Sequence, residues 1–386
     1  MKRIEQSFDK LREYVEKEDY KGWDPYDGLN SKVFQSTFFR KSTLFRLCWI
    51  QLFKRNPINL RKLFLVKKDY NAKGVGLFLS GYCNLKKIED VEDFNSITKK
   101  LTNILFEKEN KEYSGSCWGY NFDWQARAFF QPANTPTVVA STFIANSLLD
   151  LYEINNNENL LKKARSTCDF ILNDLNISKD SDGDICFSYS PLDKTQVFNA
   201  SLLGARLLAR VYSYTDEKLL FEKANSAVRY VIKKQNKDGS WSYGTLPFHS
   251  WIDNFHTGYN LECIYEYMKY TKTFDFNENI NIGMDYYLKT FFKEDGFSRY
   301  YSHKDHPLDI HAPAQLVSSL YKLDRFKENL SLIEKVLLYT INTMQDERGF
   351  FYYQKGKYIS SKIPYMRWAQ AWMFYALSLY KRGVNE

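Results

Sequence analysis

Several features that would place this sequence in a common class are missing. No apolar run is long enough to cross a bilayer, and the segment from Met1 to Gln6 lacks the apolar core of a signal peptide. The six cysteines are scattered, with no Cys-x-x-Cys pair and no paired Cys/His spacing, so we expect free thiols instead of disulfides or structural zinc. These absences predict a cytoplasmic protein, and we assign it no cofactor.

Glycine is also scarce, with 17 residues in 386, but some glycines recur at a drifting period. The clearest copy is the turn from Gln235 to Trp241, which closes an apolar, helix-like stretch. The period is roughly 55 to 65 residues, which is room for two helices. Such a repeat predicts helical hairpins that bury their apolar faces against their neighbours. The repeated glycines are Gly115, Gly183, Gly239, Gly296 and Gly349.

This pattern predicts an all-α fold, an (α/α)6 toroid or barrel of six helical hairpins. No Pro/Ser-rich linker interrupts the chain, so we expect a single barrel over residues 36–386, preceded by an N-terminal helix and loop extension over residues 1–35. Outer helices are expected near residues 36–54, 91–107, 158–174, 217–235, 278–292 and 328–345. Inner helices are expected near residues 73–87, 138–153, 197–213, 256–271, 311–323 and 367–381.

The loops that precede the inner helices carry the residues with catalytic chemistry. All five histidines lie between positions 249 and 311, and histidine titrates near neutral pH. Asp253 and His256 are three residues apart at a helix start, so the carboxylate can orient the imidazole or simply cap the helix. Asp123 is a second carboxylate for the opposite side of the mouth, and two opposed carboxylates are the usual requirement for glycoside hydrolysis. The catalytic candidates are Asp123, Asp253, His256 and His311.

Aromatic residues make up 17% of the chain, and Tyr and Trp rings are suited to stacking on sugars. A coding bias toward Phe and Tyr accounts for part of this excess. Arginines at the mouth can hold carboxylate or phosphate groups by bidentate contacts. His303-x-x-His306 is only a loose match to a metal-ligand spacing, so we assign no metal. The candidate substrate-binding residues are Trp118, Trp124, Arg127, Tyr189, Asn199, Trp251, Tyr259, Arg299, Arg367 and Trp368.

The net charge of +8 is concentrated between Lys32 and Lys73, where eleven Lys and Arg residues accompany one acid, Asp69. A basic segment of this kind fits an anionic membrane surface, and a solvated helix face is the alternative. Nucleic acid is not expected as a partner, because no nucleic-acid-binding motif accompanies the charge. The apolar residues in this segment are expected to face the barrel, and they are Leu44, Phe45, Leu47, Trp49, Ile50, Leu52 and Phe53.

The layout resembles the six-hairpin (α/α)6-barrel proteins of carbohydrate metabolism over roughly residues 36–381. The order of elements from Trp118 to Tyr212 is similar to that of the C-terminal domain of glucuronyl C5-epimerases. Segments 24–30, 54–59 and 251–259 are similar to uncharacterised bacterial proteins of surface-polysaccharide gene clusters. Some of those are labelled delta-aminolevulinic acid dehydratase, which implies a (β/α)8 barrel that the helical repeat contradicts.

The resemblance implies a carbohydrate-active protein that acts on an acidic bacterial surface polysaccharide or its lipid-linked precursor, in the cytoplasm or peripherally at the inner membrane. Hydrolysis, elimination and uronate epimerisation all remain open. One alternative is a non-catalytic saccharide-binding or scaffold protein. Another is an isoprenoid cyclase or transferase, because the turn from Gln235 to Trp241 is similar to turns of those toroids, although no Asp-x-Asp-Asp run is present.

Overall fold

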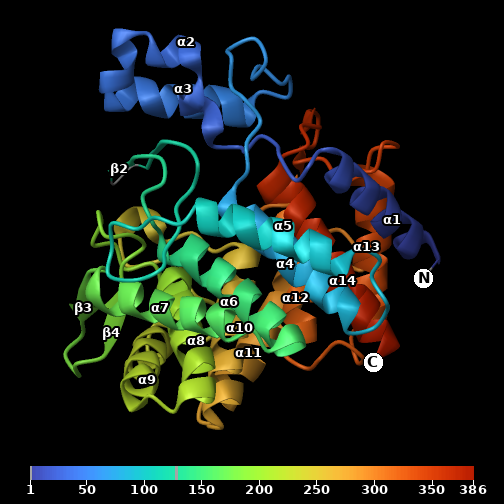
Figure 1. Ribbon diagram of the computed structural model, residues 1–386. Coiled ribbons are helices and arrows are strands. Elements are labelled where there is room, and N and C mark those ends of the chain that lie inside the picture. The colour runs from blue at the N-terminus through green and yellow to red at the C-terminus, as the bar shows by residue number, and fades with distance from the viewer. Residues whose placement is uncertain (1, 127–128) are drawn as a thin grey trace.

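The computed structural model describes residues 2–126 and 129–386, and its core is a closed ring of helices (Figure 1). Each inner helix contacts the next one along the chain, and the last contacts the first. The expected all-α (α/α)6 toroid is therefore confirmed. The inner helices are α4 (Ala72–Lys86), α6 (Val138–Asn155), α8 (Phe198–Thr215), α10 (Asn254–Thr271), α12 (His311–Lys322) and α14 (Trp372–Asn385).

The outer layer is completed by the N-terminal helix α1 (Lys2–Lys17), which packs against α13 and α14. Its buried residues Ile4, Phe8, Leu11 and Val15 are spaced four, three and four apart, which forms one apolar stripe on a helix. The first and last helices of the chain thus lie side by side. The other outer helices are α5 (Phe94–Glu107), α7 (Glu158–Asn173), α9 (Lys218–Ile232), α11 (Asn277–Phe291) and α13 (Leu330–Met344).

The outer helix expected over residues 36–54 was wrong. Helix α3 (Thr43–Arg55) contacts the turns η1 (Asp27–Asn30) and η2 (Phe38–Lys41) and the strand β1, and it stands with α2 (Lys32–Gln35) above the barrel in Figure 1. The reason is that α1 takes the outer position beside α13 and α14, while α3 buries Ile50 and Phe53 away from the ring. Residues 18–71 instead form a long connection between α1 and α4.

The inner helices approach one another closely because small residues lie at their contacts. A Cβ atom added at Gly81 would lie 2.6 Å from the Phe374 ring, and one added at Gly258 would lie 2.5 Å from Gln315 Cγ. Such small residues let the inner ring close. In the described part of the chain, no helix combines the length and apolar character needed to span a bilayer.

Short antiparallel strands lie in the connections that precede the inner helices. In the pair of β1 (Trp124–Gln125) with β2 (Phe130–Gln131), Trp124 lies opposite Gln131. The remaining strands are β3 (Ile177–Lys179) paired with β4 (Ile185–Phe187), and the sheet of β5 (Leu308–Asp309), β6 (Gln354–Lys355) and β7 (Ser360–Ser361). The turns η3 (Pro247–His249) and η4 (Met366–Ala371) complete the elements, and η4 is a π-helical start to α14.

The repeated glycines form one turn that occurs four times. The backbone φ angles of Gly183, Gly239, Gly296 and Gly349 are +83°, +91°, +90° and +100°. Residues that carry a side chain rarely adopt such values. In each copy the glycine N–H donates to the carbonyl three residues earlier. Glycine is required at position 115 for a different reason. A Cβ atom there would lie 1.9 Å from the Ser166 carbonyl oxygen.

These turns provide a matched test of the fold. A Cβ at Gly239 would lie 2.4 Å from the Ile282 carbonyl oxygen, whereas one at Gly183 would meet nothing within 4 Å. Gly183→Ala should cost about 1–2 kcal/mol for the left-handed backbone alone. Gly239→Ala should cost about 1–3 kcal/mol more because of the clash. Thermal unfolding followed by circular dichroism would measure both; equal melting midpoints for the two variants would contradict this packing.

Candidate active site

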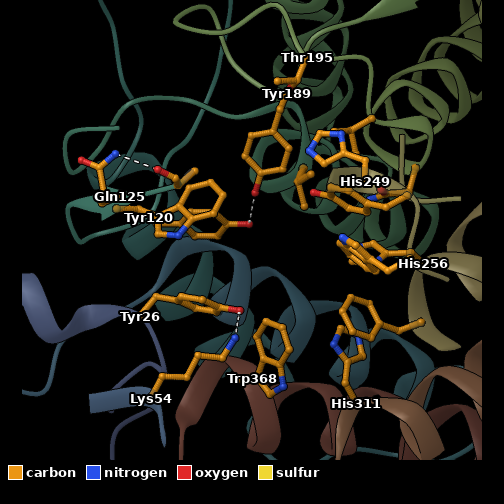
Figure 2. Close-up of a pocket in the computed structure, with 18 of the residues that line it drawn as sticks. Tyr26, Lys54, Tyr120, Gln125, Tyr189, Thr195, His249, His256, His311 and Trp368 are labelled. Carbon is orange, nitrogen blue, oxygen red and sulfur yellow. Dashed lines mark hydrogen bonds between the residues drawn. The ribbon is translucent and has the colours of Figure 1, made fainter. Parts of the chain in front are cut away.

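A cavity of about 520 Å³ opens at the end of the barrel where the inner helices begin (Figure 2). Chain segments that are far apart in the sequence meet there, as expected for the mouth of a barrel. The six inner helices, or the turns that begin them, each supply at least one lining residue: Lys73, Val139, Asn199, His256, His311 and Arg367.

Helix α3 and the loop before it form one wall of this cavity. Leu47, Gln51 and Lys54 of α3 line it, together with Tyr26. The Lys54 ammonium donates a hydrogen bond to the Tyr26 hydroxyl oxygen over 2.8 Å. Burial is the largest influence and opposes the charge of Lys54, but Tyr26, Tyr301 and Asp309 together outweigh it, so the pKa of Lys54 is raised. The cavity therefore holds a lasting positive charge on this side.

Aromatic rings cover much of the remaining wall. The Tyr243 and Trp251 rings stack with centroids 4.3 Å apart and planes 17° apart. The hydroxyl groups of Tyr120 and Tyr189 are 3.2 Å apart and share a hydrogen bond. Flat rings edged by hydroxyl groups suit a sugar, which has apolar C–H faces and a polar rim. The predicted binding residues that line the cavity are Trp124, Tyr189, Asn199, Trp251, Tyr259, Arg367 and Trp368.

His256 is held in place by Asp253. Its Nδ1 lies 2.8 Å and 3.0 Å from the two carboxylate oxygens, and the same carboxylate caps α10 by accepting the His256 backbone N–H. Since an ionised carboxylate only accepts, Nδ1 carries the proton and Nε2 carries the lone pair. No described residue forms a hydrogen bond with Nε2, and the ring lines the cavity. His256 is thus arranged as a general base, with Asp253 as its positioning residue.

His311 lies deeper and is kept neutral. Its Nε2 is 2.9 Å from the Tyr259 hydroxyl oxygen, and its ring stacks on Phe255 with centroids 4.4 Å apart. Burial, and then the positive charge of Lys73, hold the pKa of His311 well below its usual value. Burial also raises the pKa of Tyr259 well above its usual value, so this hydroxyl keeps its proton. Tyr259 can therefore donate either to His311 or to a ligand oxygen.

Asp309 fixes the aromatic floor next to His311. One carboxylate oxygen accepts from the His311 backbone N–H over 3.0 Å and from Trp368 Nε1 over 2.8 Å, and the other accepts from Gln354 Nε2 over 2.7 Å. Burial raises the pKa of Asp309 to about 6. Both carboxylate oxygens of Asp309 thus accept hydrogen bonds from protein groups, so we assign Asp309 the role of positioning His311 and Trp368.

Lys73 is a cavity residue that sequence reasoning missed, because it was counted with the basic segment. Its ammonium lies 4.2 Å from the centroid of the Phe143 ring and 5.3 Å from that of Trp372. Burial, and then repulsion by Arg367, hold the pKa of Lys73 well below its usual value. The signal was available: Lys73 is the sole charged residue between Ala72 and Leu85 in a helix that is otherwise apolar or small.

Two buried ion pairs hold the loop before α2, one of them to the start of the last inner helix and the other to the segment after α3. Arg367 donates two hydrogen bonds to Asp24, over 2.6 Å and 2.8 Å, and both residues are about 5% exposed. Arg61 donates to Asp27 over 2.7 Å and to the Asp24 carbonyl oxygen over 2.6 Å. The charge of Arg367 is therefore already balanced by Asp24.

Four of the predicted site residues do not line the cavity. Asp123 does not reach the mouth, since it precedes the strand that turns Trp124 inward and its carboxylate accepts the Ala133 backbone N–H over 2.8 Å. Trp118 is fully buried and donates to the Leu105 carbonyl oxygen. Asp253 lies behind His256, and Arg299 pairs with Asp305 over 2.8 Å in the loop before α12.

Arg127 lies outside the described residues. Among the residues that the structure does describe, no Asp or Glu lines the cavity. Likewise, no three described His, Cys, Asp or Glu side chains gather in a way that could hold a metal ion.

No protein-family profile matches this sequence, and no curated protein matches it in sequence. Solved structures do match in shape. Cellobiose 2-epimerase from Bacillus thermoamylovorans superposes with a TM-score of 0.62 over 81% of this chain and 88% of its own, at 13% identity. A D-mannose isomerase gives 0.61 over 82% and 87%, at 10% identity. An unsaturated glucuronyl hydrolase specific for heparin gives 0.59 over 81% and 85%, at 14% identity.

The chain has the six-hairpin (α/α)6 fold. It shares this fold with epimerases, an isomerase and glycoside hydrolases, all of them carbohydrate-active and all distant in sequence.

The buried pair of Asp24 and Arg367 gives a second prediction. Asp24→Asn would leave the Arg367 charge buried without its partner, which typically costs about 3–5 kcal/mol of unfolding free energy. Asp285→Asn is the matched control, because Asp285 pairs with Lys289 at the surface, where the carboxylate is 70% exposed. That control should change stability little. Urea unfolding would measure both variants, and similar midpoints would show that the Asp24 pair does not hold the loop.

Proposed function

We propose that the barrel binds an acidic saccharide in this cavity and epimerises it by moving a proton at a carbon beside a carboxylate or carbonyl carbon. The observation that carries the proposal is the set of titratable groups at the cavity. His256, Lys73, Tyr259 and His311 line it, whereas no described carboxylate does. These are the groups of general acid/base chemistry on a C–H bond.

Hydrolysis is less well supported by the same residues. Most glycoside hydrolases use two carboxylates that flank the scissile bond. Here Asp123 lies outside the cavity, and Asp253 is engaged behind His256. Elimination begins with the same proton abstraction as epimerisation, so its products, not its site, would distinguish it. An isoprenoid cyclase that acts by protonation would also need a carboxylic acid at the cavity, and no described residue supplies one.

The first proton transfer is assigned to His256. Its Nε2 takes the proton from the substrate carbon, and the electrons of that C–H bond pass to the carboxylate or carbonyl oxygen of the substrate. Asp253 stabilises the imidazolium that forms, since it holds Nδ1. The N-terminal ends of the inner helices meet at the cavity, and the positive ends of their dipoles favour the negative charge on the oxygen. The Tyr259 hydroxyl is a donor for the same oxygen.

The return of a proton to the other face is assigned to Lys73. Lys73 and His256 both line the cavity, and the Tyr259 ring centroid is 5.7 Å from Lys73 Nζ and 6.0 Å from the His256 ring centroid. The lowered pKa of Lys73 makes its ammonium a stronger acid than an ordinary lysine. One base on each face of the reacting carbon is the requirement for inversion.

Charge favours an acidic substrate. Lys54 keeps its proton and has no carboxylate partner among the described residues, so it can pair with a uronate. Two matched solved structures, cellobiose 2-epimerase and D-mannose isomerase, have names that denote epimerisation and isomerisation of sugars. The proposed source of the substrate is a bacterial surface polysaccharide or its lipid-linked precursor.

Incubation in deuterated water tests this function. Uronate oligosaccharides and neutral disaccharides are incubated with the protein and followed by NMR and mass spectrometry. We expect one solvent deuterium in an unbroken uronate and none in the neutral sugars. New reducing ends would indicate hydrolysis, unsaturated ends would indicate elimination, and binding without exchange would indicate a non-catalytic protein. Each of these three outcomes contradicts the proposal.

His256 and Asp253 should both be needed for the exchange. We expect His256→Ala and Asp253→Asn to lower its rate by about 10²–10⁴-fold, the usual contribution of a general base. His303→Ala is the control, because His303 is exposed and does not line the cavity. Full activity in both test variants would leave Asp253 and His256 as capping and packing residues.

Lys73 should be needed for inversion but not for exchange. In Lys73→Met the apolar side chain is about as long and keeps its contact with Phe143 and Trp372, so the fold should be retained. His256 would still exchange the proton on its own face. We expect deuterium in the starting epimer and little of the inverted product. Inversion at the wild-type rate would show that Lys73 takes no part in the reaction.

A further inference from the structure

One face of α3 is apolar and turned away from the rest of the molecule. We call it the α3 outer face, and its members are three or four residues apart, which places them in one stripe. Leu44 is 66% exposed, Phe45 is 45% exposed and Leu52 is 44% exposed. The α3 outer face consists of Leu44, Phe45, Cys48, Leu52 and Arg55, all of them exposed, and exposed Lys41 of η2 lies just before the helix.

The opposite face of α3 is buried or lines the cavity. Ile50 and Phe53 are buried, while Leu47, Gln51 and Lys54 line the cavity. The expectation that all seven apolar residues of this segment face the barrel was therefore wrong for Leu44, Phe45 and Leu52. A surface helix normally has one apolar face, which packs on the protein. A second apolar face that is exposed to water marks an interaction site.

Further exposed apolar side chains precede and follow α3 in the chain. The Phe38 ring is 77% exposed and lies 4.1 Å from the Phe39 ring, which lies 4.4 Å from Phe45. After α3 the chain exposes Ile58 and Leu63, at 68% and 71%. Figure 1 shows α2 and α3 standing clear of the ring of helices. Nothing in the described part of the barrel covers these side chains.

The charged residues of the segment that contains α3, residues 32–68, all have one sign. Arg40, Lys41, Arg55 and Lys62 are exposed, and no carboxylate of the described residues lies within ion-pair distance of them. The exposed positive charge of the basic segment is smaller than its sequence indicates. Three of its eleven cations turn inward: Arg61 pairs with Asp27, and Lys54 and Lys73 line the cavity.

We infer that the α3 outer face docks on the surface of an anionic lipid bilayer. A bilayer surface offers what this face lacks, an apolar boundary for the leucine and phenylalanine side chains and negative headgroups for the cations. A second copy of the chain would bring like charges together. An anionic polymer would leave the apolar side chains in water. Lipid satisfies both kinds of side chain.

Docking would bring the cavity close to the membrane. The same helix that presents Leu44, Phe45 and Leu52 outward lines the cavity with Leu47, Gln51 and Lys54. The mouth would then lie about one helix diameter, ~10 Å, from the headgroups. A saccharide carried by a membrane lipid would meet the cavity there. That last step rests on the proposed function, whereas the docking does not.

Flotation with vesicles tests the docking without any measure of activity. The protein is mixed with vesicles of phosphatidylcholine and phosphatidylglycerol, or of phosphatidylcholine alone, at low and high salt. We expect it to float with the anionic vesicles at low salt and to be released at high salt, because salt screens exposed charges. Wild-type protein that stays unbound at low salt would overturn the inference.

Two sets of substitutions separate the charge from the apolar contact. The first is Arg40→Glu, Lys41→Glu and Arg55→Glu, and each cation near an anionic surface is worth about fivefold in binding. The second is Leu44→Asn, Phe45→Asn and Leu52→Asn. We expect each set to weaken binding by about 100-fold. These side chains are exposed, so thermal unfolding should confirm an intact fold.

The matched control is Leu219→Asn, Phe274→Asn and Ile282→Asn, which removes equally exposed apolar residues from the outer layer of the barrel. It should float like the wild type. Equal binding by the Leu44, Phe45 and Leu52 variant would overturn the docking, since electrostatics alone would then explain it. Wild-type dimers in analytical ultracentrifugation that the same variant dissociates would also overturn it, because a second copy would be the occupant.

Discussion

Two arginine–aspartate pairs with almost no exposure to water meet at Asp24, where Arg367 holds the α1–α4 connection against the last inner helix and Arg61 holds the connection together. Burial of four charges is costly unless each is paired with good geometry, and here both arginines also donate or stack within the same cluster. The Asp24–Arg367 pair connects the two ends of the chain, whereas the Asp27–Arg61 pair joins two parts of the connection itself. Tyr26 lies between Asp24 and Asp27 in the sequence, so the pairs also anchor the residue that accepts the hydrogen bond of Lys54.

The cavity above these ion pairs has an unusual balance of groups. Imidazoles, a lysine of lowered pKa and several tyrosine hydroxyls line it, while the nearby carboxylates Asp24, Asp253 and Asp309 are each engaged by protein donors. Their role is to orient Arg367, His256 and Trp368. This arrangement leaves neutral bases and hydrogen-bond donors for a ligand, in surroundings where burial strengthens every electrostatic interaction. That is the physical basis for assigning proton transfer to this site.

The fold could be predicted because its signal is repeated. Four copies of one glycine turn mark the connections, and the apolar stretches between them could only pack as hairpins. The same logic brought Asn199, His256, His311 and Arg367 to one mouth. Asp123 could not be placed, because it directly precedes the short strand β1, and the side of the chain that faces the cavity there depends on a register that one sequence does not reveal.

The role of α3 was hidden for a different reason. A helix that is apolar on two sides has the same composition as an outer helix of the ring, and only the contacts show that α1 occupies that position. Lys73 was concealed by its neighbours, since a count of charges treats a buried lysine like an exposed one. Both errors concern where a side chain points, which composition does not encode.

The most direct test of the central claim is a crystal structure of the His256→Asn variant with a uronate disaccharide. The account predicts the sugar in the cavity, with its carboxylate at Lys54. Its reacting carbon should lie about 3–3.5 Å from the place that the imidazole Nε2 occupies in the wild-type protein, which is the separation expected before reaction. A disaccharide bound outside the cavity, or with that carbon turned away from residue 256, would contradict it.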